Sequence, residues 1–256
     1  MRVTFLGTGT SVGVPVIGCD CAVCRSTDPR NKRRRTSFFV EAAGQHVLVD
    51  TPPDFREQAL AYRLPRIDAV CFTHAHADHI FGFDDIRRYN TMQGGIIPAY
   101  GSASTLRDLQ RVFNYIGGEP EAGTYRPQIS FETTPAHFAF GELAVEPVLV
   151  EHGNKPTQGY LFRHDGRSVA YVPDCHGMAE RTVAQLAGID VMVLDGLRDR
   201  PHPTHLTIDE SVAVLKRIGA RTSYLIHMAH DLDHAVLEAR LPAGIKASYD
   251  GLVLEW

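Results

Sequence analysis

Four side chains that can bind metal ions lie close together in the sequence, at His74, His76, Asp78 and His79. They follow Ala69–Thr73, a short apolar segment typical of a buried strand. Side chains two positions apart on a strand point the same way, so His74 and His76 are expected to face one ion. Asp78 and His79 come after the chain begins to turn and are expected to face a second ion. Because imidazole and carboxylate suit zinc, iron or manganese, the cluster predicts a two-metal site.

A second group of ligands lies near the N-terminus, where Cys19, Cys21 and Cys24 are closely spaced. The chain has 5 cysteines, an odd number that favours thiolates in a reducing compartment over a disulfide framework. Three thiolates at this spacing favour a closed tetrahedral zinc site, which needs one more ligand. His230 is the candidate for that ligand, and residues 18–25 are then a zinc-binding loop. Redox-active or merely buried cysteines remain the alternative.

The histidine cluster resembles the His-x-His-x-Asp-His signature of the metallo-β-lactamase superfamily. The resemblance implies that His152 completes the first metal site, Asp174 bridges both ions and His227 completes the second. It also implies an α/β fold, a four-layer αβ/βα sandwich with two mixed β-sheets flanked by helices. Asp50 resembles the aspartate that precedes the signature, and we expect it to orient ligands or bound water. His205 matches the histidine that donates a proton in phosphodiesterases of the superfamily.

The cysteine segment, which follows the Gly-Thr-Gly sequence of Gly7–Gly9, is similar to that of the PhnP-type phosphodiesterases and also of the PqqB proteins. This narrower resemblance spans nearly the whole chain. It implies hydrolysis of a small phosphodiester, such as a cyclic phosphate or a nucleotide, with two divalent ions, zinc or manganese, in the active site. The residues that it implies in catalysis are His205, Asp78 and Asp174. A homodimer is an expectation from the family alone.

The charge of the site favours an anionic substrate. Two divalent ions bring more positive charge than Asp78, Asp174 and a bridging hydroxide remove, so positive charge is left to bind a phosphoryl oxygen and stabilise its transition state. Three alternatives stay open: a tRNase Z-like RNA-processing nuclease, a thioester or lactam hydrolase, and a non-catalytic PqqB-like accessory protein. The net charge of −4 and the lack of a recognisable long basic insertion count against stable nucleic-acid binding.

The remaining sequence alternates short strands with longer helices, which predicts a layered α/β domain. No linker-like stretch divides the 256 residues, so one domain over residues 1–256 is expected. The clearest helix is Thr207–Gly219, which begins with a capping-box pattern. The other expected helices are Asp54–Tyr62, Ser104–Tyr115, Met178–Ala187 and Asp233–Arg240. The expected strands are Val3–Leu6, Phe38–Glu41, His46–Asp50, Ala69–Thr73, Leu143–Val150, Tyr160–Arg163, Ser168–Val172, Val191–Asp195 and Ser223–His227.

Two basic segments lie outside these ligand clusters. Lys32–Arg35 is predicted to be a solvated loop, with the alternative that Arg34 or Arg35 grips a second phosphate at the mouth of the site. Arg87 and Arg88 are further candidates for substrate contacts. No apolar run approaches the roughly 18 residues of a membrane span, and the N-terminus lacks the pattern of a signal peptide. We therefore expect a cytoplasmic protein with no membrane partner.

Overall fold

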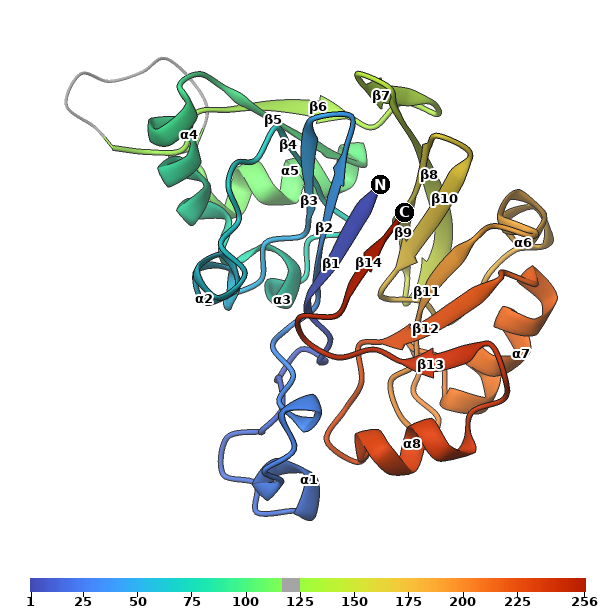
Figure 1. The fold of residues 1–256 in the computed structure, drawn as a ribbon. Coiled ribbons are helices and arrows are strands. Elements are labelled where there is room, and N and C mark those ends of the chain that lie inside the picture. Colours follow the sequence, from blue (N-terminus) through green and yellow to red (C-terminus); the bar gives the residue numbers. More distant parts are fainter. Residues whose placement is uncertain (117–124) are drawn as a thin grey trace.

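The structure, a computed structural model, describes residues 1–116 and 125–256. Within these residues two seven-stranded β-sheets face each other, and helices cover the outer face of each sheet (Figure 1). The strand order is β14-β1-β2-β3-β4-β5-β6 in the first sheet and β13-β12-β11-β10-β9-β8-β7 in the second. This arrangement confirms the four-layer αβ/βα sandwich with two mixed sheets.

The first half of the chain supplies most of one sheet and the second half supplies the other. The strands of the first sheet are β1 (Arg2–Gly7), β2 (Ser37–Ala42), β3 (Gln45–Val49), β4 (Ala69–Cys71), β5 (Ile97–Gly101), β6 (Ile129–Thr133) and β14 (Val253–Glu255). The strands of the second are β7 (Phe138–Phe140), β8 (Leu143–His152), β9 (Lys155–His164), β10 (Arg167–Val172), β11 (Val191–Asp195), β12 (Thr222–Ile226) and β13 (Ile245–Ala247). Only β14 returns from the end of the described chain to pair with β1.

The helices lie in two groups, which Figure 1 shows on opposite sides of the sandwich. Those beside the first sheet are α2 (Phe55–Ala61), α3 (Ala77–Ile80), α4 (Arg87–Gln93) and α5 (Ala103–Val112), with the 3₁₀ turn η2 (Phe83–Ile86). Those beside the second sheet are α6 (Glu180–Leu186), α7 (Ile208–Ile218) and α8 (His234–Arg240). The short helix α1 (Ala22–Arg25) and the turn η1 (Pro29–Asn31) lie in an N-terminal segment that extends away from both sheets.

Three apolar clusters hold the four layers together. The middle cluster, between the sheets, joins β1 and β2 to β9–β12 and includes the stacked rings of Phe38 and Tyr171, whose centroids are 4.7 Å apart. The outer clusters pack α2–α5 on the first sheet and α6–α8 on the second. Burial of apolar surface on both faces of each sheet is the main stabilising contribution here.

In each sheet, most of the strands that precede the predicted ligands are parallel to their neighbours. Strands β3 to β6 are parallel, and so are β10 to β13. Since parallel strands end at the same edge of a sheet, the segments that follow β3, β4, β10, β11 and β12 emerge close together. This topology positions the site.

Most expected elements are present, and the differences have physical reasons. The capping box at Thr207 is confirmed, with α7 ending at Gly219 in the left-handed conformation. The expected strand Ala69–Thr73 ends at Cys71, because the chain then turns toward the histidines. Other elements were not expected from the sequence because they are short or lack a clear apolar period: β5–β7, β13, β14, α1, α3 and α4. None of the described helices is long and apolar enough to cross a membrane.

Candidate metal centres

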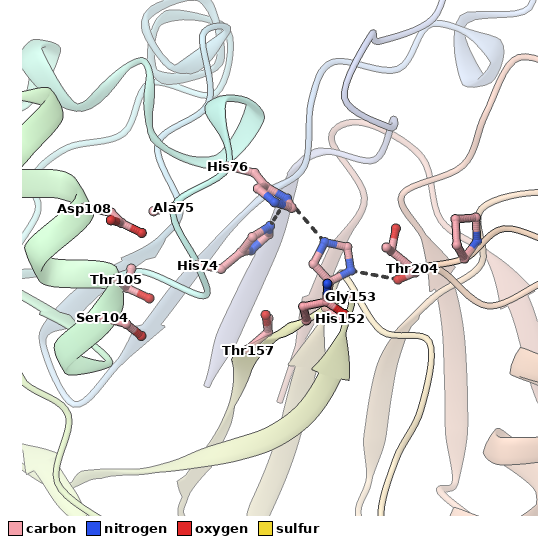
Figure 2. A pocket seen from close by; sticks show the side chains of 12 residues that line it. His74, Ala75, His76, Ser104, Thr105, Asp108, His152, Gly153, Thr157 and Thr204 are labelled. Carbon is pink, nitrogen blue, oxygen red and sulfur yellow. Dashed lines mark hydrogen bonds between the residues drawn. The ribbon is translucent and has the colours of Figure 1, made fainter.

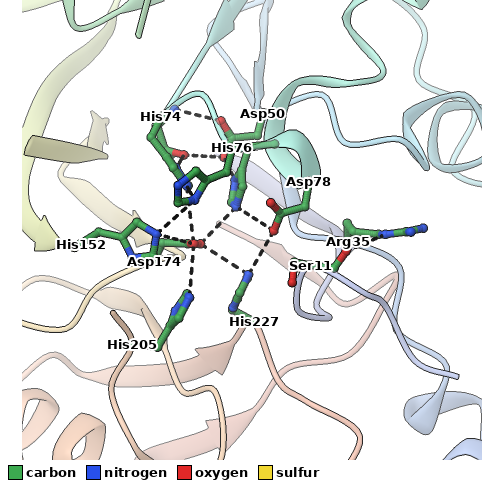
Figure 3. A network of polar contacts seen from close by, with 12 residues as sticks. Ser11, Arg35, Asp50, His74, His76, Asp78, His152, Asp174, His205 and His227 are labelled. Atoms are coloured by element: carbon green, nitrogen blue, oxygen red, sulfur yellow. Dashed lines mark hydrogen bonds and ion pairs between the residues drawn. The ribbon is translucent and has the colours of Figure 1, made fainter. Parts of the chain in front are cut away.

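The predicted histidine and aspartate ligands meet at the edge where the carboxyl ends of both sheets come together (Figure 3). The first sheet contributes the segment between β4 and η2, in which helix α3 begins just after His76. The second sheet contributes His152, the last residue of β8, and the residues that follow β10 and β12. The parallel register of β10, β11 and β12 aligns these ends, so Asp174 and His227 reach the same place.

The first ligand set consists of His74, His76, His152 and Asp174, whose ligand atoms all lie within 4.8 Å of one another. The Nδ1 atom of His76 is 2.8 Å from His74 Nε2 and 3.3 Å from His152 Nε2. Asp174 Oδ2 lies 3.7 Å from His74 Nε2 and 3.5 Å from His152 Nε2. Two ligand atoms on one tetrahedral zinc ion are about 3.4 Å apart, so these spacings fit a shared ion.

The second ligand set consists of Asp78, His79 and His227, together with the other oxygen of Asp174. Asp78 Oδ2 lies 3.4 Å from His79 Nε2 and 3.5 Å from His227 Nε2. Asp174 Oδ1 lies 3.2 Å from His79 Nε2 and 3.7 Å from His227 Nε2. The two oxygens of Asp174 therefore face different ligand sets, as a carboxylate that bridges two ions requires.

Unpaired polar atoms in this centre fit metal ions better than hydrogen bonds. His79 Nε2 and Asp174 Oδ1 are buried and have no hydrogen-bond partner in the described structure, although they are only 3.2 Å apart. A buried polar atom without a partner is costly unless it binds something else. Burial also lowers the pKa of His152 to about 4, which keeps its imidazole neutral and able to bind a metal. The residues present therefore fit a pair of divalent ions.

Asp50 orients one histidine of each ligand set, His79 directly and His74 through Thr73. Its Oδ2 atom accepts from Nδ1 of His79 at 2.8 Å and from the Thr73 hydroxyl at 2.8 Å. The Thr73 oxygen in turn lies 3.0 Å from Nδ1 of His74. The imidazoles of His79 and His74 thus present Nε2 to the metal site, since Nδ1 of each carries the proton. Asp50 thus orients metal ligands, as expected from the sequence.

His227 lacks such a contact. The Nδ1 atom of His152 donates to the carbonyl of Thr204 at 2.7 Å, whereas the buried Nδ1 atom of His227 has no hydrogen-bond partner among the described residues. The backbone of His227 also has a φ of 61°, in the left-handed region that non-glycine residues rarely adopt. Its ring position therefore depends on how the neighbouring backbone is held.

His205 lies beside the two ligand sets and is held by an aspartate that the sequence analysis did not identify. Its Nδ1 atom donates to Asp195 Oδ2 at 2.7 Å, while its Nε2 atom is 3.9 Å from Asp174 Oδ2. Its ring stacks on that of His227, with centroids 4.7 Å apart. Asp195 is fully buried at the end of β11 and also accepts from the backbone N–H of Cys175. Its position at a strand end, like those of Asp50 and Asp174, is the only signal that could have identified it.

The cysteine cluster is separate from this centre. Sγ atoms of Cys19, Cys21 and Cys24 lie 3.3, 3.5 and 3.6 Å from His230 Nδ1. The backbone N–H of Cys24 donates to Cys21 Sγ, and that contact, with those to His230 and the other thiols, lowers the pKa of Cys21 to about 6. Burial raises the pKa of Cys24 to about 11. The four ligand atoms lie within 4.8 Å of one another, which fits the predicted tetrahedral zinc site.

Comparison with known proteins identifies the family. The model of the family described as a beta-lactamase superfamily domain matches residues 45–228. The chain belongs to the metallo-β-lactamase superfamily. Within the superfamily, a crystal structure described as a new diphosphatase from the PhnP family is 41% identical with a TM-score of 0.91, and the match covers 100% of this chain and 97% of that one. The chain is therefore a PhnP-like metallo-β-lactamase superfamily hydrolase, a group that uses divalent metal ions.

Curated relatives carry two different names. An octanoyltransferase from Porphyromonas gingivalis is 36% identical over 98% of this chain. The chain spans only 51% of that relative, about half its length. A coenzyme PQQ synthesis protein B from Methylorubrum populi is 27% identical over 77% of this chain and 73% of the relative. The structure of the short form of human tRNase Z, 18% identical over 100% of this chain and 99% of that one with a TM-score of 0.73, shows a shared fold alone.

A cavity of about 480 Å³ opens beside the first ligand set of this superfamily member (Figure 2). His74, His76 and His152 form one wall of it. Ser104 and Thr105, from the first turn of α5, face them across the cavity. Neither residue was a predicted site residue, because hydroxyl groups at a helix start also serve as capping groups.

The basic residues Arg87 and Arg88 lie elsewhere. They line a separate groove of about 640 Å³ between α2 and α4, and no residue of that groove lines the cavity beside the histidines. Arg87 pairs with Asp84 at 2.9 Å and lies over the ring of Tyr125. Arg87 and Arg88 therefore do not line the cavity beside the metal ligands, and their role in contacting a substrate stays a prediction.

The prediction of a solvated loop at Lys32–Arg35 needs correction at one position. Arg33 is only 1% exposed, so the prediction of a solvated loop is wrong at that position. Arg35 pairs with Asp54 at 2.8 Å and extends away from the histidine cluster (Figure 3). Arg34 contacts Tyr62 and Asp250. Neither Arg34 nor Arg35 lines the cavity beside the metal ligands, so binding of a second phosphate by either residue at the mouth of the site stays a prediction.

Proposed function

We propose that the protein is a dinuclear metal-dependent phosphodiesterase that hydrolyses a small anionic phosphodiester, such as a cyclic phosphate or a nucleotide. The observation that carries the proposal is the placement of Asp174, whose oxygens face two complete ligand sets. His205 lies beside both sets, within 3.9 Å of the same carboxylate. A single structural ion would need neither a bridging carboxylate nor a histidine held beside it.

Each ligand set has one role in this proposal. The first ion would be held by His74, His76, His152 and Asp174, and the second by Asp78, His79, His227 and Asp174. Divalent ions at these places supply Lewis-acid stabilisation of phosphoryl charge and lower the pKa of bound water. Burial alone would raise the pKa of Asp78, but His79 and the hydrogen bond with His227 lower it below its ordinary value, so Asp78 remains an anionic ligand.

His205 is proposed to protonate the leaving alkoxide. Asp195 accepts the Nδ1 proton of His205, which leaves Nε2 facing the metal ligands and available to carry the proton that is transferred. The ring cannot turn away easily because it packs between His152 and His227, with both centroid distances at 4.7 Å. Asp195 thus fixes which nitrogen of His205 faces the substrate.

A second candidate function is hydrolysis of a diphosphate bond. The name of the 41% identical structure, a diphosphatase, favours it. The same metal sites serve both reactions, since both place charge on phosphoryl oxygens. The reactions differ in the leaving group, because a phosphate leaves without a proton far more readily than an alkoxide does. His205 should therefore matter less for diphosphate bonds.

The test combines metal analysis with hydrolysis of three substrates: a bis-aryl phosphodiester, a dialkyl-type cyclic phosphate and an alkyl-capped diphosphate. We expect up to three metal ions per chain and hydrolysis of the diesters that stops on chelation and returns with divalent ions. Folded, metal-loaded protein that hydrolyses only the diphosphate would favour the second candidate. Inactivity toward every diester would contradict the phosphodiesterase proposal.

Changing His205→Ala tests the proton donor. Hydrolysis of a diester with an alkyl leaving group should fall by about 10²- to 10⁴-fold, while an activated aryl diester should lose much less. The metal content should stay unchanged, which would distinguish a proton donor from a metal ligand. His202→Ala is the matched control, since His202 lies on the same loop with its ring 5.1 Å from that of His205. Equal losses for both leaving groups would contradict the assignment.

The proposal also covers a structural zinc site, the size of the substrate, the oligomeric state and the location of the protein. Cys19, Cys21, Cys24 and His230 would hold one structural zinc, which a fixed zinc-to-chain ratio after mild chelation would support. The substrate would be small, so stable binding of nucleic acid is not expected. A homodimer and a cytoplasmic location stay predictions, and sedimentation measures the first of them.

A further inference from the structure

Arg33 lies in the interior of the protein and contacts the backbone on both sides of His230. Its side chain is among the largest that are fully buried. Its Nη1 atom donates to the carbonyl of Ala229 at 2.9 Å, and its Nη2 atom donates to the carbonyl of Leu232 at 2.7 Å. A planar guanidinium donates to the two carbonyls from separate nitrogens of a rigid fork, whereas an ammonium has a single nitrogen on a flexible stem. Arg33 therefore holds the backbone that presents His230 to the three cysteines.

The backbone of Arg33 is fixed as firmly as its side chain. It pairs with Val14, which precedes the cysteine loop, through two hydrogen bonds of 2.8 Å. Gly9 packs against it so closely that a Cβ atom there would lie 2.7 Å from the Arg33 carbonyl oxygen. Gly9 also forms a bridge with Met228, the residue after His227. Arg33 thus joins the start of the cysteine loop to the segment that carries both histidine ligands.

The segment 227–232 needs this support. His227 adopts a φ of 61° and has no hydrogen-bond partner for its Nδ1 atom among the described residues. A strained backbone of this kind persists only where its surroundings hold it in place. Backbone hydrogen bonds hold part of it, from Met228 N to the Thr8 carbonyl at 3.0 Å and from Ala229 N to the Leu197 carbonyl at 2.9 Å. Arg33 adds the side-chain contact to the carbonyl of Ala229.

The burial of Arg33 is costly if it serves stability alone. Its described hydrogen-bond partners are two backbone carbonyls and the amide oxygen of Asn31, and none of them carries a charge. Burial lowers the pKa of Arg33 to about 10. The carboxylates of Asp250, Asp233 and Asp28 act against this lowering from a distance, but none of them is a hydrogen-bond partner of the guanidinium. A buried charge that is not directly paired with an opposite charge generally destabilises a fold relative to an apolar side chain. A role in holding geometry accounts for the residue better than a role in stability.

We propose that Arg33 is a positioning residue that couples the cysteine cluster to the second ligand set of the dinuclear centre. It sets the path of residues 227–232, so that His230 closes one site while His227 completes the other. This inference rests on the metal sites of the proposed function. The Arg33 side chain would then connect two metal sites that share no ligand.

The experiment measures cobalt binding to full-length protein in the wild type and in the variants Arg33→Met and Arg33→Lys. Co²⁺ bound to thiolates gives a charge-transfer absorption that the histidine and aspartate ligand sets do not give, so both kinds of site are read in one titration. Arg30→Met is the matched control, since Arg30 lies on the same segment and pairs locally with Asp28. Circular dichroism checks that each variant is folded.

We expect Arg33→Met to weaken cobalt binding at the cysteine cluster and at the second ligand set together, each by about 10- to 100-fold. Arg33→Lys should show nearly the same loss, because its ammonium cannot reach both carbonyls at once. Arg30→Met should bind like the wild type. Should Arg33→Met fail to fold, Arg33→Lys, which keeps the charge and most of the alkyl chain, provides the same measurement.

A double-mutant cycle tests the coupling itself. Cys21→Ser should weaken binding at the second ligand set in the wild-type background and do so much less in the Arg33→Lys background. Unchanged cobalt affinities in folded Arg33 variants, full rescue by lysine, or additive effects in the cycle would each overturn the inference. Wild-type protein that binds no cobalt at the histidine sites would instead contradict the proposed function, so the two failures are distinguishable.

Discussion

The two candidate metal centres of this protein are assembled in opposite ways. Three of the four ligands at the cysteine cluster are neighbours in sequence, and a single distant residue, His230, completes it. The proposed dinuclear centre takes its ligands from both sheets, and Asp174 lies between its two ligand sets. A local cluster depends on one loop and one long-range contact, whereas the dinuclear centre depends on the register of several strands.

The support around the ligands differs in the same way. Backbone N–H groups hold the thiolates, as when Val16 N donates to Cys24 Sγ at 3.3 Å. Buried side chains hold the imidazoles, as when Asp50 accepts from His79 at 2.8 Å. We therefore expect side-chain substitutions around the dinuclear centre to change its chemistry. Substitutions in the cysteine loop should act mainly on stability.

The largest effect is expected from Asp174→Asn. Loss of the bridging charge should remove at least one ion of the dinuclear centre and lower diester hydrolysis by more than about 10³-fold. The cysteine cluster should keep its zinc. Metal analysis and initial rates measure both effects, with Asp165→Asn in the β9–β10 turn as the control. A variant with full metal content and near-normal rates would show that Asp174 does not bridge two ions.

Cys21→Ser should affect the other centre. It should release one zinc ion and lower the melting temperature by about 5 °C or more, because binding energy at a structural site contributes to folding. The rate of hydrolysis should fall by no more than about tenfold, through the link to His227. Asp20→Asn, an exposed position between two cysteines, is the control. Loss of all metal ions together would contradict the division into two centres.

Asp50→Asn should have a smaller effect, confined to the dinuclear centre. Asparagine tolerates the φ of 61° at this position, so the substitution removes charge with little backbone strain. Affinity for the ion bound by His79 should fall by about 10- to 100-fold, since His79 loses its anionic partner. Competition with a coloured chelator measures this change. An unchanged affinity would show that Asp50 serves packing alone.

The smallest effect on the metal sites is expected at Asp250, which touches neither of them and acts on stability instead. Burial raises its pKa to about 7 from the ordinary 3.8, so the folded protein holds this proton more tightly than the unfolded protein does. Its contribution to stability is therefore present at low pH and is lost as pH rises from about 4 to about 7, by about 1.4 kcal/mol per pH unit. Asp250→Asn should remove this dependence from urea unfolding curves. Parallel curves for variant and wild type would contradict the raised pKa.

Much of the candidate site could be predicted from spacing and resemblance. The spacing of His74, His76, Asp78 and His79 indicated two ions, because strand alternation and a following turn divide the ligands between two directions. The thiolates indicated a zinc site that lacked one ligand, and the structure brings His230 to it. The capping box at Thr207 is a purely local signal, and the helix begins there as expected.

Other features depend on tertiary structure alone. Asp195 supports His205 only because β10, β11 and β12 run parallel in register, a relation that a single sequence does not state. Arg33 lies in a run of basic residues, and charge patterning predicts such a run to be solvated. Its burial is decided by backbone carbonyls almost 200 positions away in the chain. Sequence thus determined which residues can bind metal, because ligand chemistry is local, whereas the fold decided what holds them, because long-range packing sets every supporting contact.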